Sequence, residues 1–473
     1  MKILAINPPQ IYCKGETPRI VFPIGLAYVV SILKKSNYQI DVLDCIGEYP
    51  YLKEYSREYN LLGFGIKTLK KNLIKKKPNI VLISCPISNQ HSLVVKISKI
   101  VKRYTNAKII VGGAHASAMP QSLINENTID FIVIGEGELT ISNLLKSLNQ
   151  KRKIKKIPGL AFKENKKTQI NPPFDFISNI DNIPFPAYEL FPYENYVTSN
   201  YKHTLLNSKK RIAEIITSRG CPFECSFCAS KSVTSKKWRG RTPENVLKEI
   251  EYLKNNYKIE EIHFLDDNIS LDTKRFKKLC NLMRNNNISW TIPNGISMKT
   301  IDKETIKLMK QSGCYAIFFP VETANTFINK KHIPKNPPPK TIKELIRYSH
   351  KKGLYNVGFF LLGFWEEDKK SIEKTIKFAC DLKLDEAHFS ILTPLPGSQY
   401  YKTYAKDFTS FRDLSAKKAT IDTKHLNRKE LESLRDKAYI VFEFNKFFDR
   451  PLSYLNISQL SRILRYMKYI LAR

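Results

Sequence analysis

The chain has 473 residues, which is too long for one compact core and fits two or three domains. Hydrophobic residues make up 42% of the chain and aromatic residues 11%, and this composition excludes global disorder. The 78 Lys and Arg residues outnumber the 44 Asp and Glu residues and give a formal charge of +34. Because the lysines are spread along the whole chain, the charge indicates a general bias rather than a dedicated basic patch, and we expect no nucleic-acid partner.

The N-terminus lacks the charged segment, apolar core and cleavage site of a secretory signal. The longest apolar stretch, residues 20–33, contains Pro23 and is shorter than a membrane span of about 20 residues. We therefore expect a cytoplasmic protein. Nine cysteines in a reducing compartment argue against a disulfide framework. Three of them are clustered, and six are scattered: Cys13, Cys45, Cys85, Cys280, Cys314 and Cys380.

Residues 1–150 alternate short apolar runs with helical patterns, which predicts an α/β domain with a doubly wound, Rossmann-like parallel sheet. An amphipathic helix is expected over 93–101. Residues 151–205 are predicted to form a hairpin and a linker that packs on both neighbours. The expected strands of the sheet are 3–7, 40–43, 80–84, 109–112 and 131–134.

The alternation restarts over residues 206–404 and predicts a partial (β/α)6 TIM-type barrel, whose chemistry would lie at the carboxyl ends of its strands. The helices between the strands place Cys280 and Cys380 on apolar faces, so we interpret both as core residues. The expected strands are 212–217, 261–265, 289–292, 316–321, 357–362 and 388–392.

Residues 405–473 are predicted to form a small, mostly helical C-terminal extension. An apolar stripe with interspersed basic residues indicates a packing or oligomer helix, and peripheral membrane contact is the alternative. The stripe consists of Ile457, Leu460, Leu464, Met467 and Leu471.

The clustered cysteines Cys221, Cys225 and Cys228 form a CxxxCxxC motif directly after the first strand of the second region. Thiolates are soft ligands that suit iron–sulfur clusters or zinc. Ordinary cubane clusters take four cysteines, and three clustered cysteines leave one iron open for another ligand. Zinc stays the alternative, although structural zinc sites usually pair CxxC units with a fourth Cys or His.

This motif, placed on the loop after a first barrel strand, resembles the radical S-adenosylmethionine superfamily, in which S-adenosylmethionine chelates the open iron. The resemblance continues over residues 211–400. It implies a 4Fe–4S cluster on the three cysteines that reductively cleaves S-adenosylmethionine to a 5′-deoxyadenosyl radical. The further cofactor contacts that it implies are Phe227, Asp266, Asp267, Glu322 and Gly358.

The sequence departs from the family pattern at two of these contacts. Asp266-Asp267-Asn268 stands where glycine-glycine-glutamate is common, a substitution seen in the cobalamin-linked branch. Glu322 is followed by Thr323-Ala324 instead of the frequent serine-glycine. An Asp at a strand end can also simply cap the next helix.

Small residues also end two expected strands of the first domain, at Ser84 and at Gly112-Gly113, where glycines let a bulky ligand approach the backbone. Placed before a radical domain, this arrangement resembles the cobalamin-binding domain of cobalamin-dependent radical enzymes. The cobalt-binding Asp-x-His-x-x-Gly motif is absent, so we expect no protein histidine on cobalt; His115 contacts the nucleotide tail or is structural. The implied cobalamin contacts are Ser84, Gly112, Gly113, His115, Gly135 and Glu136.

The resemblance implies an enzyme that methylates an unactivated carbon and takes electrons from a donor such as flavodoxin or ferredoxin. We expect a small-molecule or lipid-like biosynthetic substrate. One alternative is a cobalamin-assisted oxidation or cyclisation, and another is a non-catalytic cobalamin-binding sensor or carrier. A third is a methylthiotransferase acting on tRNA, since Cys13, Cys45 and Cys85 lie near where that family has three further cluster ligands.

Overall fold

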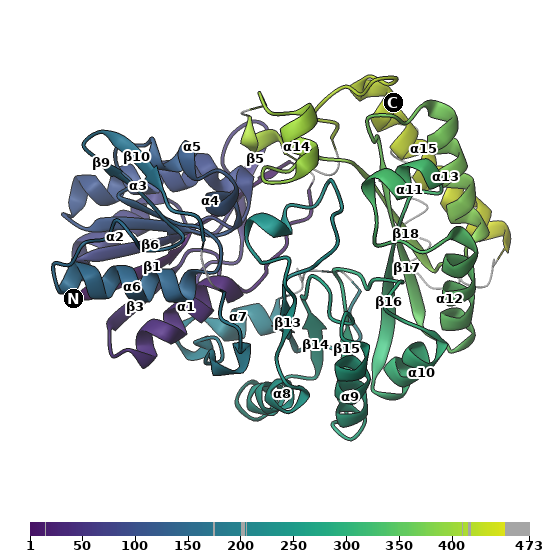
Figure 1. The fold of residues 1–473 in the computed structure, drawn as a ribbon, viewed down its shortest axis with the longest axis horizontal. Helices are drawn as coiled ribbons and strands as arrows, with labels where there is room; N and C mark the ends of the chain where they lie inside the picture. The colour runs from purple at the N-terminus through teal and green to yellow at the C-terminus, as the bar shows by residue number, and fades with distance from the viewer. Residues whose placement is uncertain are drawn as a thin grey trace. The chain divides into compact units, whose positions relative to one another are not determined.

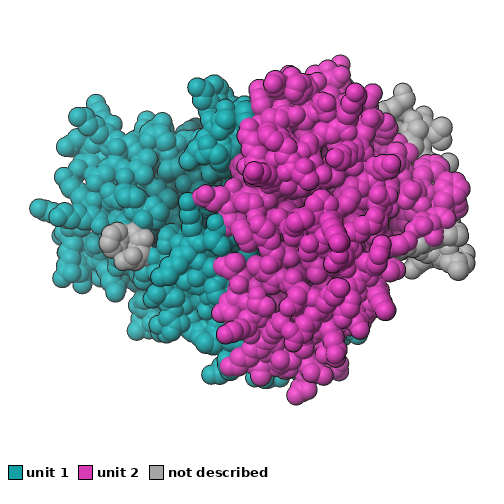
Figure 2. All heavy atoms as spheres, turned by 45° about the vertical axis from the view of Figure 1, so that its right-hand side comes forward, with its two compact units in different colours: residues 1–222, 228–269, 395–413 teal, residues 223–227, 270–394, 414–473 magenta. Residues whose placement is uncertain are grey.

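The described residues form two compact units, which are coloured separately in Figure 2. The computed structural model describes residues 1–14, 16–173, 176–199, 204, 206–408, 410–414 and 418–449. Unit 1 comprises residues 1–222, 228–269 and 395–413, and unit 2 comprises residues 223–227, 270–394 and those from 414 onward. Because the units combine segments distant in the chain, the boundaries of the predicted domains 1–150, 151–205, 206–404 and 405–473 stay a prediction.

Unit 1 is built on a seven-stranded sheet with the order β10-β9-β8-β7-β6-β1-β3, which confirms the predicted doubly wound sheet. Five neighbouring strands, from β8 to the edge strand β3, are parallel, and the chain reverses direction across the sheet between β1 and β6, the place where such sheets bind ligands. The parallel strands are β1 (Lys2–Asn7), β3 (Gln39–Asp44), β6 (Ile80–Ser84), β7 (Lys108–Gly112) and β8 (Phe131–Val133). The predicted hairpin, β9 (Leu160–Glu164) and β10 (Lys167–Ile170), extends the sheet in antiparallel fashion.

Helices cover this sheet because its strands β1, β6 and β7 are apolar on both faces. Leu4, Ile6, Val81 and Ile83 pack into one core cluster with buried residues of α2 and α3. Helix α1 packs against α6 in the same unit (Figure 1). The helices are α1 (Ile24–Lys35), α2 (Ile66–Lys76), α3 (His91–Tyr104), α4 (Ala114–Ala118), α5 (Pro120–Ile124) and α6 (Gly137–Asn149).

A second, three-stranded antiparallel sheet in unit 1 is not among the predicted elements. It joins β2 (Gln10–Cys13), β5 (Tyr59–Leu62) and β4 (Leu52–Glu54) in the order β2-β5-β4. All three residues of β4 are exposed. The segment therefore lacks the alternation of apolar and polar residues by which a strand is recognised in a sequence.

The segment between the two sheet regions of unit 1 packs closely through its tyrosines. Tyr188, Tyr193 and Tyr196 are buried, and the ring of Phe22 lies 5.4 Å from that of Tyr188 and 4.8 Å from that of Tyr193. The Tyr188 hydroxyl lies 2.7 Å from Glu249 Oε1, and the Tyr196 hydroxyl lies 2.8 Å from Asp44 Oδ2. This packing holds helix α7 (Tyr193–Thr198) and the 3-10 turns at Ile180–Asn182 and Tyr188–Leu190.

Strands appear at all six positions predicted for the second region. In unit 1, β11 (Ile212–Ile215) pairs in parallel with β14 (Glu261–Phe264), and α8 (Pro243–Tyr257) lies between them in the chain. In unit 2, β15 (Ser289–Thr291), β16 (Cys314–Glu322), β17 (Tyr355–Leu362) and β18 (Glu386–Ile391) are parallel neighbours. The closure of these strands into a partial barrel stays a prediction.

The helices of unit 2 lie outside its strands. Helices α10, α12, α13 and α15 lie on the same side of β16, β17 and β18 (Figure 1). None of the helices among the described residues combines the length and apolarity that a membrane span requires. The predicted stripe from Ile457 to Leu471 lies outside the described residues. The long helices are α9 (Thr273–Met283), α10 (Lys303–Gln311), α12 (Pro339–Lys351), α13 (Lys369–Asp381) and α15 (Arg428–Asp449).

The packing of unit 2 around Trp290 generates a first prediction. The Trp290 side chain in β15 is fully buried, its Nε1 donates a hydrogen bond to the Ser312 carbonyl at 2.8 Å, and its ring contacts Phe276. We expect Trp290→Phe to lower the free energy of unfolding by about 2 kcal/mol, because it leaves a small cavity and an unpaired carbonyl. Urea denaturation of the cofactor-free protein, followed by circular dichroism, measures this change.

Phe444→Leu is the control for Trp290→Phe, since Phe444 on α15 is 49% exposed. We expect this variant to unfold at the wild-type urea concentration. A wild-type midpoint for Trp290→Phe itself would contradict the packing described.

Candidate cofactor sites

The cysteine motif lies in a loop whose two ends are joined in unit 1. Strands β12 (Ser218–Arg219) and β13 (Arg239–Gly240) form a short antiparallel pair at its base. Gly220 has a φ of +91°, and a Cβ on it would lie 2.5 Å from the Lys237 carbonyl oxygen, so only glycine fits there. The Cys221 amide donates to the Ser235 carbonyl at 3.3 Å, and Trp238 Nε1 donates to the Asn268 carbonyl at 2.8 Å. The start of the motif is therefore fixed by backbone geometry.

The three motif cysteines provide the donor set that an iron–sulfur cluster takes. Cys225 is buried, whereas Cys221 and Cys228 are half-buried, and Cys228 Sγ lies 3.2 Å from Ser230 Oγ. Three thiols are soft donors, so the residues present fit this cofactor, and their assignment as its ligands stays a prediction. Across the described ranges, no three His, Cys, Asp or Glu side chains form a group that would hold a single metal ion.

The scattered cysteines of unit 2 lie in or near its core. Cys280 and Cys314 are buried, and burial raises the pKa of Cys280 to about 12. Cys380 is half-buried, and its Sγ lies 4.0 Å from the Val441 carbonyl of α15. These surroundings suit the predicted packing role of Cys280 and Cys380.

The two aspartates after β14, Asp266 and Asp267, have different surroundings. The Asp266 carboxylate is buried and accepts hydrogen bonds from the Thr217 amide at 3.1 Å, the Thr217 hydroxyl at 2.8 Å and the Ser218 hydroxyl. It thus ties the end of β14 to the segment after β11. Asp267 is an exposed residue, and its Oδ2 lies 3.1 Å from the Thr234 hydroxyl. Of the two predicted contacts, Asp267 carries the carboxylate that a ligand can reach.

Glu322 ends β16 in unit 2 in a strained conformation. Its φ is +64°, which is costly for a residue with a side chain, and the pairing of β16 with β17 shifts register just before it. The side chain is buried and forms an ion pair with Lys335 at 2.8 Å. Strain of this kind gathers at functional sites, which supports the predicted cofactor role of Glu322.

Lys335 also brings a second predicted residue of unit 2, Phe227, near Glu322. Its Nζ lies over the Phe227 ring, 5.6 Å from the ring centre, as well as beside the Glu322 carboxylate. A cation in this position interacts favourably with both groups. Nothing in the sequence distinguished Lys335 among the chain's 78 basic residues.

Gly358 in β17 lies on the face of its strand that packs against the rest of unit 2. A Cβ on Gly358 would lie 2.6 Å from Leu384 Cδ1, so the position has no room for a side chain. Phe359, the next residue, points to the opposite face, where it is half-buried beside Phe318 and His388. The predicted cofactor contact of Gly358 can involve only its backbone, and Phe359 is a candidate that the motif comparison missed.

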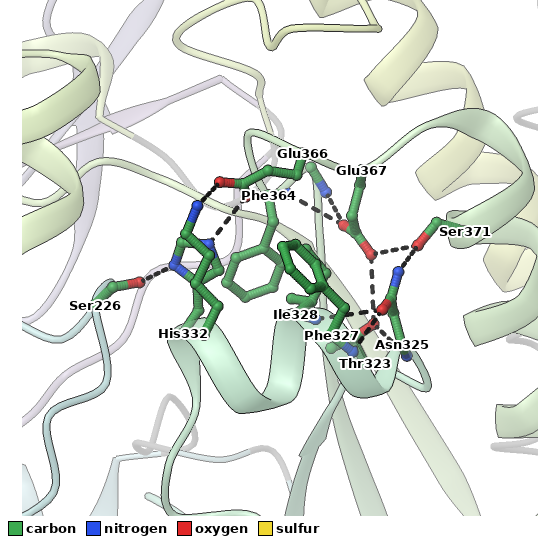
Figure 3. A network of polar contacts seen from close by, with 12 residues as sticks. Ser226, Thr323, Asn325, Phe327, Ile328, His332, Phe364, Glu366, Glu367 and Ser371 are labelled. Atoms are coloured by element: carbon green, nitrogen blue, oxygen red, sulfur yellow. Dashed lines mark hydrogen bonds and ion pairs between the residues drawn. The ribbon is translucent and has the colours of Figure 1, made fainter.

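The turn after β17 carries a buried carboxylate, Glu367, which Figure 3 shows between two loops of unit 2. Glu367 Oε2 accepts hydrogen bonds from the amides of Gly363 at 2.9 Å and Phe364 at 3.1 Å. Glu367 Oε1 lies 3.3 Å from the hydroxyls of both Thr323 and Ser371. Burial raises the pKa of Glu367 to about 7 against the opposing effect of these hydrogen bonds. This carboxyl therefore links the turn to Thr323, the residue after Glu322.

At the carboxyl edge of the unit 1 sheet, Ser84 and Gly112 lie opposite each other on β6 and β7. A Cβ on Gly112 would lie 3.7 Å from Val133 Cβ, an ordinary contact distance, so this position has room for a methyl group. Gly113 has a φ of +114°, and a Cβ on it would lie 2.7 Å from the Cys85 carbonyl oxygen. Gly112 is therefore a position where a ligand could lie close to the backbone. At Gly113 the backbone conformation itself requires glycine.

His115, at the start of α4, is held by the chain itself. Its Nδ1 lies 2.9 Å from the Ser88 hydroxyl and its Nε2 lies 2.9 Å from His91 Nδ1, while Phe411 packs on its ring. Burial lowers the pKa of His115 to about 4, with a further contribution from His91. A neutral ring with both nitrogens engaged favours the structural alternative for this residue.

The predicted cobalamin contacts Gly135 and Glu136 follow β8, and Glu136 makes buried ion pairs. The Gly135 amide donates to the Ser117 hydroxyl at 2.9 Å. The Glu136 carboxylate pairs with Arg219 at 3.3 Å and with both terminal nitrogens of Arg239. Arg219 also pairs with Glu138 at 2.7 Å. Because Arg219 and Arg239 are the paired residues of β12 and β13, these carboxylates bind the base of the cysteine loop within unit 1.

The contrast between Gly112 and Gly113 generates a second prediction. We expect Gly113→Ala to lower the melting temperature of the cofactor-free protein, because the methyl group meets the Cys85 backbone at a positive φ. We expect Gly112→Ala to leave the melting temperature unchanged but to weaken cobalamin binding, which absorbance titration of the folded variant measures.

Each glycine variant serves as the control for the other, since both make the same chemical change at neighbouring positions. Equal losses of thermal stability in the two variants would contradict the geometry. Unchanged cobalamin affinity in Gly112→Ala would remove Gly112 from the cobalamin site.

The buried Glu367 generates a third prediction, on pH. Since its pKa is raised from 4.5 to about 7, the folded protein holds the proton more tightly than the unfolded chain does. The free energy of unfolding should therefore fall by about 3 kcal/mol as the pH rises from about 4.5 to about 7, and stay level above that range. We expect Glu367→Gln to remove most of this decline, measured by urea denaturation at a series of pH values.

Glu373→Gln is the control for Glu367→Gln, because the Glu373 side chain on α13 is 39% exposed and pairs with Lys437. We expect this variant to keep the wild-type dependence on pH. An unchanged decline in Glu367→Gln would show that another group causes it.

Comparisons with known proteins match both regions of the chain. The family model described as "Radical SAM superfamily" matches residues 215–379, and the one described as "B12 binding domain" matches residues 14–145. An uncharacterized methyltransferase of Pyrococcus horikoshii is 33% identical over 456 residues, which cover 93% of this chain and 92% of the relative. The cytidylyl-2-hydroxyethylphosphonate methyltransferase of Streptomyces wedmorensis is 27% identical and covers 84% of this chain and 80% of its own length.

Among solved structures, the radical S-adenosylmethionine methyltransferase TsrM from Kitasatospora setae, with cobalamin and a 4Fe–4S cluster bound, matches with a TM-score of 0.67 at 17% identity. The match covers 84% of this chain and 73% of that chain, and it shows a shared fold. The fold, the two matched domains and the close relative over nearly its whole length lead to one conclusion. The chain belongs to the radical S-adenosylmethionine family whose members carry a B12-binding domain.

Proposed function

We propose that the chain methylates an unactivated carbon of a small-molecule or lipid-like substrate, with cobalamin and S-adenosylmethionine as cofactors. The observation that carries this proposal is that the Arg219 and Arg239 pair at the base of the cysteine loop binds Glu136 and Glu138 of the cobalamin-type domain. A radical site and a corrinoid site that share one buried ion network suit a reaction that uses both. The two relatives compared above are named methyltransferases, which supports methylation as the outcome.

In this proposal the chain's own residues hold and orient the cofactors. Cys221, Cys225 and Cys228 would bind the cluster, and Phe227, Asp267 and Glu322 would contact S-adenosylmethionine. Ser84 and Gly112 would lie against cobalamin. When bound, the cluster supplies the electron that cleaves S-adenosylmethionine, and the corrinoid supplies the methyl group.

Within unit 2, Glu322 and Lys335 would set the charge of the S-adenosylmethionine site. The buried Glu322 carboxylate can accept hydrogen bonds from ligand hydroxyl groups, and Lys335 forms an ion pair with it at 2.8 Å. Lys335 also limits the movement of Phe227, on whose ring its ammonium lies. A flavodoxin or ferredoxin as electron donor is part of the proposal.

The methylthiotransferase alternative is disfavoured by the positions of the other cysteines of unit 1. Cys45 and Cys85 follow β3 and β6, which β1 separates in the sheet, and Cys13 lies in the small second sheet. Burial raises the pKa of both Cys45 and Cys85, which opposes the thiolate form that binds iron. Oxidation or cyclisation remains the second candidate, since its cofactors are the same.

A fourth prediction distinguishes methylation from oxidation or cyclisation and needs no known substrate. We expect the anaerobically reconstituted protein to bind about four irons per chain and, with a strong reductant, to convert S-adenosylmethionine into 5′-deoxyadenosine. With S-adenosylmethionine labelled on its methyl group, the label should appear on the bound cobalamin, as mass spectrometry of the extracted corrinoid would show. Unlabelled cobalamin would overturn methylation in favour of oxidation or cyclisation.

Two cysteine variants provide the controls for this experiment. Cys225→Ala should abolish 5′-deoxyadenosine formation while the far-ultraviolet circular dichroism stays that of the wild type. Cys380→Ala, at a half-buried position on α13, should retain the activity. An absence of 5′-deoxyadenosine in the wild type would favour the sensor or carrier alternative.

A further inference from the structure

The segment Ser226-Phe227, which lies between two predicted cluster ligands, is anchored in unit 2 by His332. The Ser226 hydroxyl lies 2.8 Å from His332 Nδ1, and the Ser226 amide donates to the His332 carbonyl at 3.0 Å. His332 is the last residue of α11 (Thr326–His332) and is buried. A single residue of a helix end thus binds both the side chain and the backbone of the motif, as Figure 3 shows for the side chain.

Glu366 orients the His332 ring from the other side. His332 Nε2 lies 2.9 Å from one Glu366 oxygen (Figure 3). Lys331 pairs with the other oxygen. Burial alone would raise the pKa of Glu366, but hydrogen bonds from Lys331 and His332 outweigh it and lower the pKa. An ionised carboxylate only accepts hydrogen bonds, so Nε2 carries the proton. Nδ1, the other ring nitrogen, lies 2.8 Å from the Ser226 hydroxyl, so the ring connects Glu366 to Ser226.

Apolar contacts hold the same segment. The His332 ring lies on Phe364, with ring centres 5.3 Å apart and an angle of 36° between the planes. Phe364 in turn meets the ring of Phe227 edge-on, with centres 6.3 Å apart. Ser226 is therefore held by hydrogen bonds to the end of α11, and Phe227 is held by packing against the turn after β17.

We propose that His332, oriented by Glu366, is a positioning residue for the iron–sulfur cluster: by fixing Ser226 it holds the loop on which Cys225 and Cys228 lie and slows the loss of the cluster. This inference rests on the cluster of the proposed function. A cluster with three protein ligands depends on each of them, and the motif has no helix or strand of its own from Cys221 to Cys228. The loop is therefore fixed by its contacts with His332 instead of by hydrogen bonds within a helix or strand of its own.

The order serine, histidine, carboxylate is also that of a hydrolytic triad. Two observations favour positioning over nucleophilic catalysis. Ser226 lies one residue from Cys225 and two from Cys228, and its amide is bonded to His332 as well as its hydroxyl. Covalent labelling of Ser226 by a serine-directed fluorophosphonate would overturn the positioning role.

The test compares cluster loss in variants that remove the two ends of one contact. Ser226→Ala removes the hydroxyl, and His332→Phe removes the ring nitrogens while keeping an aromatic ring against Phe364. After anaerobic reconstitution, iron release to an excess of a coloured chelator is followed with no substrate present. We expect each variant to release iron about tenfold faster than the wild type, the usual effect of losing a hydrogen-bonding partner of a metal-ligating segment.

The double variant decides whether His332 acts through Ser226. If it does, the double variant releases iron no faster than the faster single variant, because both changes break the same contact. Rates that multiply in the double variant, or single variants that release iron at the wild-type rate, overturn the inference. The electron paramagnetic resonance spectrum of the reduced cluster, which should change equally in both single variants, is the second readout.

Two further variants complete the design. His350→Phe makes the same chemical change at an exposed position of α12 and should leave iron release unchanged. Glu366→Gln keeps the shape of the side chain but not its charge, and we expect it to speed iron release. It replaces His332→Phe in the test if that variant does not fold. A wild-type protein that binds no cluster overturns the proposed function as well, whereas a stable cluster that is unaffected by every variant overturns this inference alone.

Discussion

The ion network of Arg219, Arg239, Glu136 and Glu138 is the constraint on which the arrangement of unit 1 depends. Their side chains are at most 12% exposed, and each guanidinium is paired with carboxylate oxygens. Burial alone would raise the pKa of Glu138, but Arg219 outweighs it and lowers the pKa. Removing one member of such a network leaves a buried charge without compensation, at a cost of about 3–5 kcal/mol. The turn after β8 and the base of the cysteine loop are thus bound to each other, so the corrinoid sheet and the start of the radical motif form one body.

A second pair of adjacent carboxylates organises unit 2 in a different way. Glu366 is paired with Lys331 and His332, which lower its pKa, whereas Glu367 has only amide and hydroxyl donors, and burial raises its pKa to about 7. Glu366 reaches the cysteine motif through His332, and Glu367 reaches Thr323 beside Glu322. One turn after β17 therefore connects the predicted cluster loop and the predicted S-adenosylmethionine contact through two carboxylates whose pKa values are shifted in opposite directions.

The sequence was sufficient for the elements that depend on local pattern, and insufficient for those that depend on distant partners. Buried parallel strands are continuous apolar runs, so all the predicted strands of both regions appear within a few residues of their expected ends. The exposed strand β4 has no such run and was missed. Lys335 and His332 were missed for another reason, since their contacts with Phe227 and Ser226 join residues about 110 positions apart in the chain. No local pattern encodes such a contact.

The predicted cofactor residues also differ in how far distant parts of the chain already engage their polar atoms. A polar group can bind a ligand only to the extent that the chain has not already engaged it. Asp266, His115 and Glu136 each have their polar atoms engaged by neighbouring residues of unit 1. Gly112 has room for a methyl group, and Asp267 is exposed. A family motif therefore marks two kinds of residue, those that touch the cofactor and those that hold the first kind in place, and only the hydrogen bonds and ion pairs of the folded chain distinguish them.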